Sequence, residues 1–161
     1  KYGVDAVRYF LLREISATED GDFSEEKFKE RYNGDLASGL GNLVARVAKL
    51  AQVTKTKKIG NGKSLIAGYK ISLDDSREKY KESLEKFEFS MVLSAIWALI
   101  KFCDQEVERN KLWEKNDKQK DIISSLLFLI GEIAKFLEPF MPETSSKILK
   151  NKTGGPLFPR I

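Results

Sequence analysis

The stretch Leu36-Ala-Ser-Gly-Leu-Gly-Asn-Leu-Val-Ala-Arg-Val47 decides the fold class. Its leucines and valines recur at spacings of three and four residues, the period of an apolar face on a helix. The pattern continues to about Val53, and it follows Ser24, a candidate N-cap with Glu25 and Glu26 behind it. We therefore predict one long amphipathic helix over residues 25–53.

Three glycines, Gly34, Gly39 and Gly41, lie inside this predicted helix. Each costs a helix interior roughly 0.5 to 1 kcal/mol relative to alanine. They therefore indicate a bend in the helix, or the close approach of another backbone or a ligand.

A short helix is predicted before the long one, over residues 4–12. Val4, Val7, Phe10 and Leu11 fall on one side of it, and Asp5 stands in its first turn. We expect the side carrying Val4 and Leu11 to pack against the rest of the molecule.

Further helices are predicted after the long one, beyond an aperiodic basic connection over residues 54–70. They cover residues 73–87, 90–110, 122–137 and 143–149, with Pro139 and Pro142 before the last. Val92, Ile96, Leu99, Cys103 and Val107 form the expected core face of the second of these, together with Ala95. No period of two persists over a convincing length, so the predicted fold class is all-α, a helical bundle.

The composition narrows the classes of function. The 161 residues include one cysteine, Cys103, and no histidine, so neither an internal disulfide nor the usual zinc ligand sets are expected. The commonest general base is also missing, which argues against catalysis by this chain alone and predicts no catalytic residue and no metal site. The formal net charge of +4 permits an anionic partner. No run reaches the roughly 18 apolar residues of a membrane span and Lys1 opens no signal peptide, so we predict a cytoplasmic location and no membrane partner.

Asn42 and Arg46 lie four residues apart, which places them on one face of the long helix. At about 100° per residue they fall on the flank of the apolar face, so both side chains are expected to reach solvent or a ligand. An ordinary solvated helix face is the competing interpretation of the spacing alone.

Two tryptophans receive different interpretations. Trp113 follows the predicted helix 90–110 in a stretch that is polar except for Leu112, where a ring beside cations is a common platform for an unpaired base. Burial against a helix end is the alternative for Trp113. Trp97 lies between Ile96 and Leu99 and is expected to pack against another helix.

Two other segments are interpreted as loops. The run Gly60-Asn-Gly-Lys63 lacks the flanking strand and helix of a phosphate-binding loop, and we expect a turn. The acidic run Glu19-Asp-Gly-Asp22 lacks the spacing and closing glutamate of a calcium loop, so solvent exposure is the simpler expectation.

Several longer runs resemble bacterial-type methionyl-tRNA synthetase, a class I aminoacyl-tRNA synthetase. They are Tyr2-Gly-Val-Asp-Ala-Val-Arg-Tyr-Phe-Leu-Leu-Arg-Glu14, Glu19-Asp-Gly-Asp-Phe-Ser24, Tyr32-Asn-Gly-Asp-Leu-Ala37, Leu40-Gly-Asn-Leu-Val-Ala-Arg46, Phe136-Leu-Glu-Pro-Phe-Met-Pro-Glu-Thr144 and Pro156-Leu-Phe-Pro-Arg-Ile161. Together they span nearly the whole chain, with none between about residues 54 and 89.

The resemblance implies a helical bundle of the class I synthetase anticodon-binding type, which binds the anticodon stem-loop of tRNA(Met) and reads CAU. The family's Asn-x-x-x-Arg anticodon motif falls on Asn42 and Arg46, and its stacking tryptophan falls on Trp113. Leu112 stands where the family has a proline before that tryptophan. The implied role is in methionine–tRNA ligation during protein synthesis.

The resemblance also implies a division of the protein. The family's catalytic domain, which binds ATP and methionine, carries HIGH-like and KMSKS-like signatures that are not found here. This chain is accordingly expected to hold no cofactor. Residues 1–23 would connect to the catalytic domain, and residues 24–161 would form the anticodon-binding domain with a C-terminal tail that returns toward the body.

Two alternatives remain. One is the anticodon-binding domain of a related synthetase, for leucine, valine, isoleucine or cysteine. The Asp20-Gly-Asp-Phe-Ser24 run and the terminal Leu157-Phe-Pro-Arg-Ile161 run favour methionine. The other is a helical protein-interaction module whose partner occupies a groove near Gly39 and Gly41.

Overall fold

The computed structural model describes residues 2–15, 23–56, 66–114, 118–150 and 156–161. Within these ranges every regular element is helical, which confirms the all-α prediction. In chain order the elements are α1 (Val4–Glu14), α2 (Glu25–Arg31), η1 (Tyr32–Gly41), α3 (Asn42–Thr54), α4 (Ala67–Glu85), α5 (Phe89–Arg109), α6 (Gln119–Leu137) and α7 (Pro142–Leu149).

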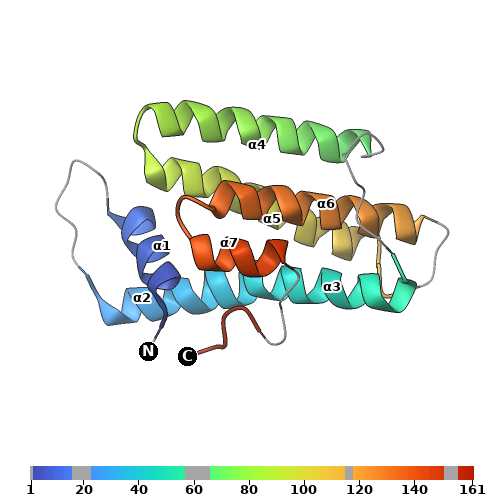
Figure 1. The fold of residues 1–161 in the computed structure, drawn as a ribbon, viewed down its shortest axis with the longest axis horizontal. Coiled ribbons are helices and arrows are strands. Elements are labelled where there is room, and N and C mark those ends of the chain that lie inside the picture. The colour runs from blue at the N-terminus through green and yellow to red at the C-terminus, as the bar shows by residue number, and fades with distance from the viewer. Residues whose placement is uncertain (1, 16–22, 57–65, 115–117, 151–155) are drawn as a thin grey trace.

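The helices form a layered bundle (Figure 1). The segments α2, η1 and α3 run in line along one side, α4 runs along the opposite side, and α5 and α6 lie between them. α1 crosses one end of the bundle. Residues 156–161 pass beside the continuous helical segment formed by α2, η1 and α3, which we call the long rod. The buried faces of α5 and α6 supply much of the core, and the expected core face from Val92 to Val107 is buried as predicted.

The predicted long helix is present without a break from Glu25 to Thr54, and Ser24 caps it by accepting a hydrogen bond from the Lys27 amide. Its middle, η1, is a π-helix, which the α-helical period did not predict. The Asn42 amide donates to the carbonyl of Ala37, five residues earlier, as a π-helix requires.

Two of the three glycines of η1, Gly39 and Gly41, are places of close approach, as predicted. A Cβ at Gly41 would lie 3.0 Å from the Leu36 carbonyl oxygen and 3.8 Å from the Phe158 ring. A Cβ at Gly39 would lie 3.7 Å from Nε1 of Trp97. Gly34 has open space around it.

The predicted packing face of α1 is wrong for three of its four residues. Val4, Val7 and Leu11 are exposed, and the buried residues are Asp5, Ala6, Tyr9 and Phe10. The reason is specific pairing: the Asp5 carboxylate accepts a 2.7 Å hydrogen bond from the Thr144 amide in the first turn of α7, and Tyr9 stacks on Trp97. Because a buried carboxylate needs such a partner, α1 packs through the side that carries Asp5 and Tyr9. Its valines therefore face solvent.

The other helices begin and end within a few residues of their predicted boundaries, with one exception. α4 begins at Ala67, six residues before the predicted start, because Tyr69 and Leu73 are both buried at helical spacing. Trp97 packs against another helix as expected, with its ring centroid 4.5 Å from that of Tyr9. The acidic run Glu19–Asp22, the Gly60–Lys63 turn and most of the basic connection lie outside the described residues.

Candidate nucleic-acid interface

α3 presents Asn42 and Arg46 one turn apart, at its N-terminal end. Asn42 is exposed, and the Arg46 side chain keeps 26% of its surface accessible. Leu43, Val44 and Val47 point into the core and fix the rotation of the helix. The predicted position on the flank of the apolar face is therefore confirmed for both residues.

The Arg46 guanidinium lies between two carboxylates of α5. Its Nη1 donates to Asp104 at 3.2 Å, and its Nη2 donates to Glu108. Both carboxylates are about half exposed, so each pair contributes at most about 1 kcal/mol of stability. Arginine has five N–H donors, and these two bonds leave three of them for another acceptor.

Trp113 meets Arg46 although 66 other residues separate them in the sequence. The Arg46 Cζ atom lies 5.8 Å from the centroid of the Trp113 ring, within the range of a cation–π contact. The tryptophan is 54% exposed, so a ring surface remains open to solvent. The alternative of a fully buried indole at the helix end does not hold.

The turn that carries Trp113 closes α5 through a Schellman motif. Lys111 has a left-handed backbone with φ 42°, and its amide donates to the Glu108 carbonyl at 3.0 Å. The Leu112 amide donates to the Val107 carbonyl at 3.2 Å, and both of these side chains are completely buried. This pair of bonds defines the motif.

A hollow of about 320 Å³ opens beside Asn42, between the long rod and the C-terminal tail. Pro156, Phe158 and Arg160 line it on the tail side. The Arg160 guanidinium donates to Ser38 Oγ at 3.1 Å, and among the described residues the lining holds no carboxylate. Sequence reasoning did not single out Arg160 as a site residue, because its proximity to Asn42 arises from the return of the tail.

The tail is held in this place by an amide pair. Asn33 of η1 donates from Nδ2 to the Ile161 carbonyl at 2.8 Å, and its Oδ1 accepts from the Ile161 amide at 3.0 Å. Phe158 is buried and meets Tyr32 edge to face, with ring centroids 5.8 Å apart. The tail therefore forms one wall of the hollow.

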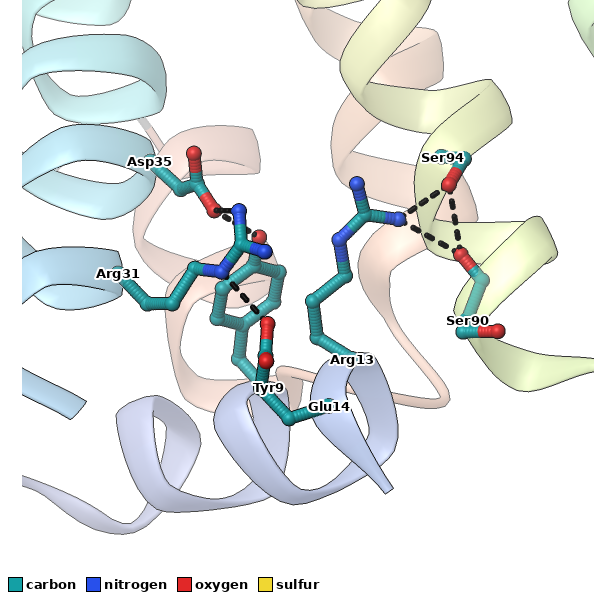
Figure 2. Close-up of polar contacts among 7 residues, drawn as sticks. All are labelled: Tyr9, Arg13, Glu14, Arg31, Asp35, Ser90 and Ser94. Atoms are coloured by element: carbon teal, nitrogen blue, oxygen red, sulfur yellow. Dashed lines mark hydrogen bonds and ion pairs between the residues drawn. The ribbon is translucent and has the colours of Figure 1, made fainter. Parts of the chain in front are cut away.

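α1 is tied to the rod by a second polar cluster (Figure 2). The Tyr9 hydroxyl donates to Asp35 of η1 at 2.7 Å. Arg31 bridges from α2, with Nε 2.6 Å from Glu14 and Nη1 3.4 Å from Asp35. Burial of Tyr9, aided by the charge of Asp35, raises the pKa of the phenol well above its usual range.

α1 is also tied to α5 on its other side. Arg13 Nη1 donates to the Ser90 carbonyl at 2.7 Å and to the Ser94 hydroxyl (Figure 2). Arg8 donates to the Pro139 carbonyl at 2.8 Å, at the turn before α7. α1 is therefore bound to the body of the bundle along its length, while its valines remain exposed.

Neither a metal-binding cluster nor a membrane-spanning helix occurs in the described part of the chain. It contains no group of three or more residues arranged to hold a metal ion. None of its helices has the length and apolar character needed to cross a membrane.

Comparison with protein families identifies the fold. The family of the anticodon-binding domain of tRNA ligase matches residues 72–158, more than half of the chain. The chain belongs to this anticodon-binding family. Residues 1–48 match a second family, tRNA synthetases class I (M). Thus α1, α2, η1 and the first half of α3, which carries Asn42 and Arg46, match a synthetase model. Residues from within α4 through α7 match the anticodon-binding model.

The similar proteins of this family are methionine–tRNA ligases. That of Lactococcus lactis is 34% identical over 93% of this chain, and that of Clostridium tetani is 35% identical over 91%. The chain spans 24% of the length of each. The Mycobacterium tuberculosis methionyl-tRNA synthetase in complex with methionyl-adenylate superposes on 99% of this chain, with TM-score 0.78 and 26% identity over 38% of its own length.

Proposed function

We propose that this chain is the part of a methionine–tRNA ligase that binds the anticodon stem-loop of tRNA(Met) and reads its CAU triplet. In this proposal Trp113 stacks an unpaired anticodon base, and Asn42 and Arg46 hydrogen-bond to base edges. Membership of the anticodon-binding family and the methionine-specific relatives support it.

The approach of Arg46 to Trp113 is the observation that carries the proposal. The two residues come from different elements, yet the cation lies 5.8 Å from the ring centroid, with Asn42 one turn away. A stacking surface beside donors with unused N–H groups is what recognition of a splayed base requires. The competing interpretation, an ordinary solvated helix face, does not explain why an exposed tryptophan lies beside Arg46.

In this proposal, cationic side chains around the site contact the phosphate backbone of the RNA. Arg160 and Lys49 are exposed, and Arg160 edges the hollow beside Asn42. Phosphate contacts position a nucleic acid without specifying its sequence. Base contacts by Asn42 and Arg46 would supply the specificity.

The chemical step belongs to the rest of the enzyme in this proposal. ATP and methionine would bind a catalytic domain, and this chain would hold no cofactor. Residues 1–23 would connect to that domain, and the exposed Val4, Val7 and Leu11 face of α1 is the apolar surface available for it. A hollow of about 440 Å³ lies along this face. The proposed compartment is the cytoplasm.

The test is binding of the chain to anticodon stem-loops that differ only in the triplet. We expect tighter binding of CAU than of a scrambled triplet, and Asn42→Ala should reduce this preference by weakening CAU alone. Gln52→Ala is the matched control, because it removes an exposed amide from the same helix about 15 Å away. Equal loss for both triplets in Asn42→Ala would remove base reading from this residue.

The two alternative functions make different predictions. A related synthetase domain would prefer another triplet in the same experiment. A protein-interaction module would place its partner in a groove near Gly39 and Gly41. Gly41 lines the hollow beside Asn42, whereas Trp97 approaches Gly39. Retention of a protein, with no preference among stem-loops, would favour that alternative.

A further inference from the structure

The turn that presents Trp113 is built differently from the Pro-Trp pair of the resembled family. A proline before the tryptophan fixes one backbone angle by its ring, and it has no amide hydrogen. In this chain the preceding residue is Leu112, whose amide donates to Val107. A proline cannot make that bond, so another device must hold the turn here.

The Schellman motif supplies only part of the restraint. It fixes the chain up to Leu112, but it uses a lysine in a left-handed conformation that glycine adopts more readily. The amide of Glu114 then donates to the Lys111 carbonyl at 2.8 Å. These bonds are local, and they leave the Leu112 carbonyl without a role in the motif.

Gln119 contacts that carbonyl from the next helix. Its Nε2 donates to the Leu112 oxygen at 2.6 Å, across seven residues of sequence. Gln119 is the first residue of α6 and is partly buried. The Ile122 and Ile123 side chains that follow it are buried, so α6 is an anchored element. The hydrogen bond therefore ties the peptide unit joining Leu112 to Trp113 to the rigid core.

We propose that Gln119 is a positioning residue for Trp113, which replaces the restraint that a proline gives in the resembled family. It acts through the Leu112 carbonyl and touches no base itself. Arg46 contacts the indole itself through its cation–π interaction. The inference rests on the proposed function only for its effect on RNA binding, because the effect on the tryptophan ring exists in the free protein.

The experiment measures both effects in a Trp97→Phe background, where Trp113 is the single tryptophan. Gln119→Met keeps a side chain of similar length and removes the donor. Time-resolved fluorescence anisotropy of the free chain should show more rapid motion of the Trp113 ring. Affinity for the CAU stem-loop should fall by about two- to tenfold, the effect of losing one hydrogen bond.

Gln119→Lys is the rescue variant, because its ammonium group can donate to the same carbonyl. We expect it to restore slow ring motion and most of the affinity. Gln52→Met is the matched control for the loss of an amide, and neither measurement should change. Helix content by circular dichroism confirms that each variant is folded, and Gln119→Glu provides a second donor-free variant of nearly the same shape.

The outcomes separate the inference from the proposed function. Unchanged ring motion in folded Gln119→Met or Gln119→Glu overturns the positioning role, whatever happens to RNA binding. Faster ring motion with unchanged affinity for the CAU stem-loop also overturns it as a contributor to RNA binding. If the parent chain shows no preference for CAU, the proposed function fails, and the anisotropy result still decides whether Gln119 fixes the tryptophan.

Discussion

The Arg46 guanidinium carbon lies 5.8 Å from the centre of the Trp113 ring, and the same guanidinium is held by Asp104 and Glu108. The arginine thus links α3, α5 and the turn after α5 at one point. Because three of its N–H groups are not used by the carboxylates, it is oriented and still able to donate. In the proposed function this arrangement would prepare the site before the RNA arrives and so reduce the entropy cost of binding.

Replacing Trp113 tests the stacking role. Trp113→Ala should weaken binding of a CAU stem-loop by about 1 to 3 kcal/mol, as expected for one stacked base. Trp113→Phe should lose less, because an aromatic face remains. Isothermal titration calorimetry measures both, with Trp97→Phe as the control for a tryptophan that stacks on Tyr9 inside the bundle. Unchanged affinity in Trp113→Ala would contradict the assignment.

Replacing Arg160 tests the hollow beside Asn42 as a place for the RNA backbone. Arg160→Gln should lower the affinity for CAU and scrambled loops alike, and it should reduce the slope of log affinity against log salt by about 0.7. Lys79→Gln is the control, because it removes one positive charge from an exposed position on α4. A loss confined to CAU would mean that Arg160 contacts a base.

Tyr9 predicts how stability depends on alkaline pH. Its burial and the Asp35 carboxylate raise the pKa of the phenol in the folded state above that of the unfolded chain. The unfolded state therefore loses this proton first. The stabilisation is fully present below about pH 10 and is lost as the pH rises further.

Tyr9→Phe is the corresponding variant. It should flatten the fall in the free energy of unfolding above pH 10, by up to about 1.4 kcal/mol per pH unit. At neutral pH it should cost about 1.5 kcal/mol or more, because the hydroxyl donates to a carboxylate. Urea unfolding at a series of pH values measures both quantities. Parallel curves for the two proteins would exclude a contribution from Tyr9.

Two glycines of η1 should respond in opposite directions to alanine. Gly34→Ala adds a methyl group in open space, so it should stabilise the chain by about 0.5 to 1 kcal/mol. Gly41→Ala places the methyl group 3.0 Å from the Leu36 carbonyl oxygen, a backbone atom, and should be destabilising. Thermal unfolding of the pair measures this contrast, and stabilisation by both would show that the π-helical segment tolerates a side chain at 41.

The prediction from sequence was strongest where the signal is local. The spacing of Leu36, Leu43 and Val47 predicted a helix, and the i, i+4 spacing put Asn42 and Arg46 on one face. Close approach at the glycines was predicted correctly for two of the three. Each of these depends on neighbours within a turn or two of the chain. For Trp113 the sequence left exposure and burial against a helix end both open, and the structure shows that the ring is exposed.

The sequence by itself determined that this protein is helical and which faces of α3 and α5 are apolar. Only the tertiary structure decided that α1 buries Tyr9 and exposes Val4, and that the tail sets Arg160 beside Asn42. It also decided that Gln119 reaches Leu112 and that Arg46 meets Trp113. Helical periodicity is a local property, whereas the partner of each polar group depends on segments far apart in the chain, which become neighbours only when the core forms.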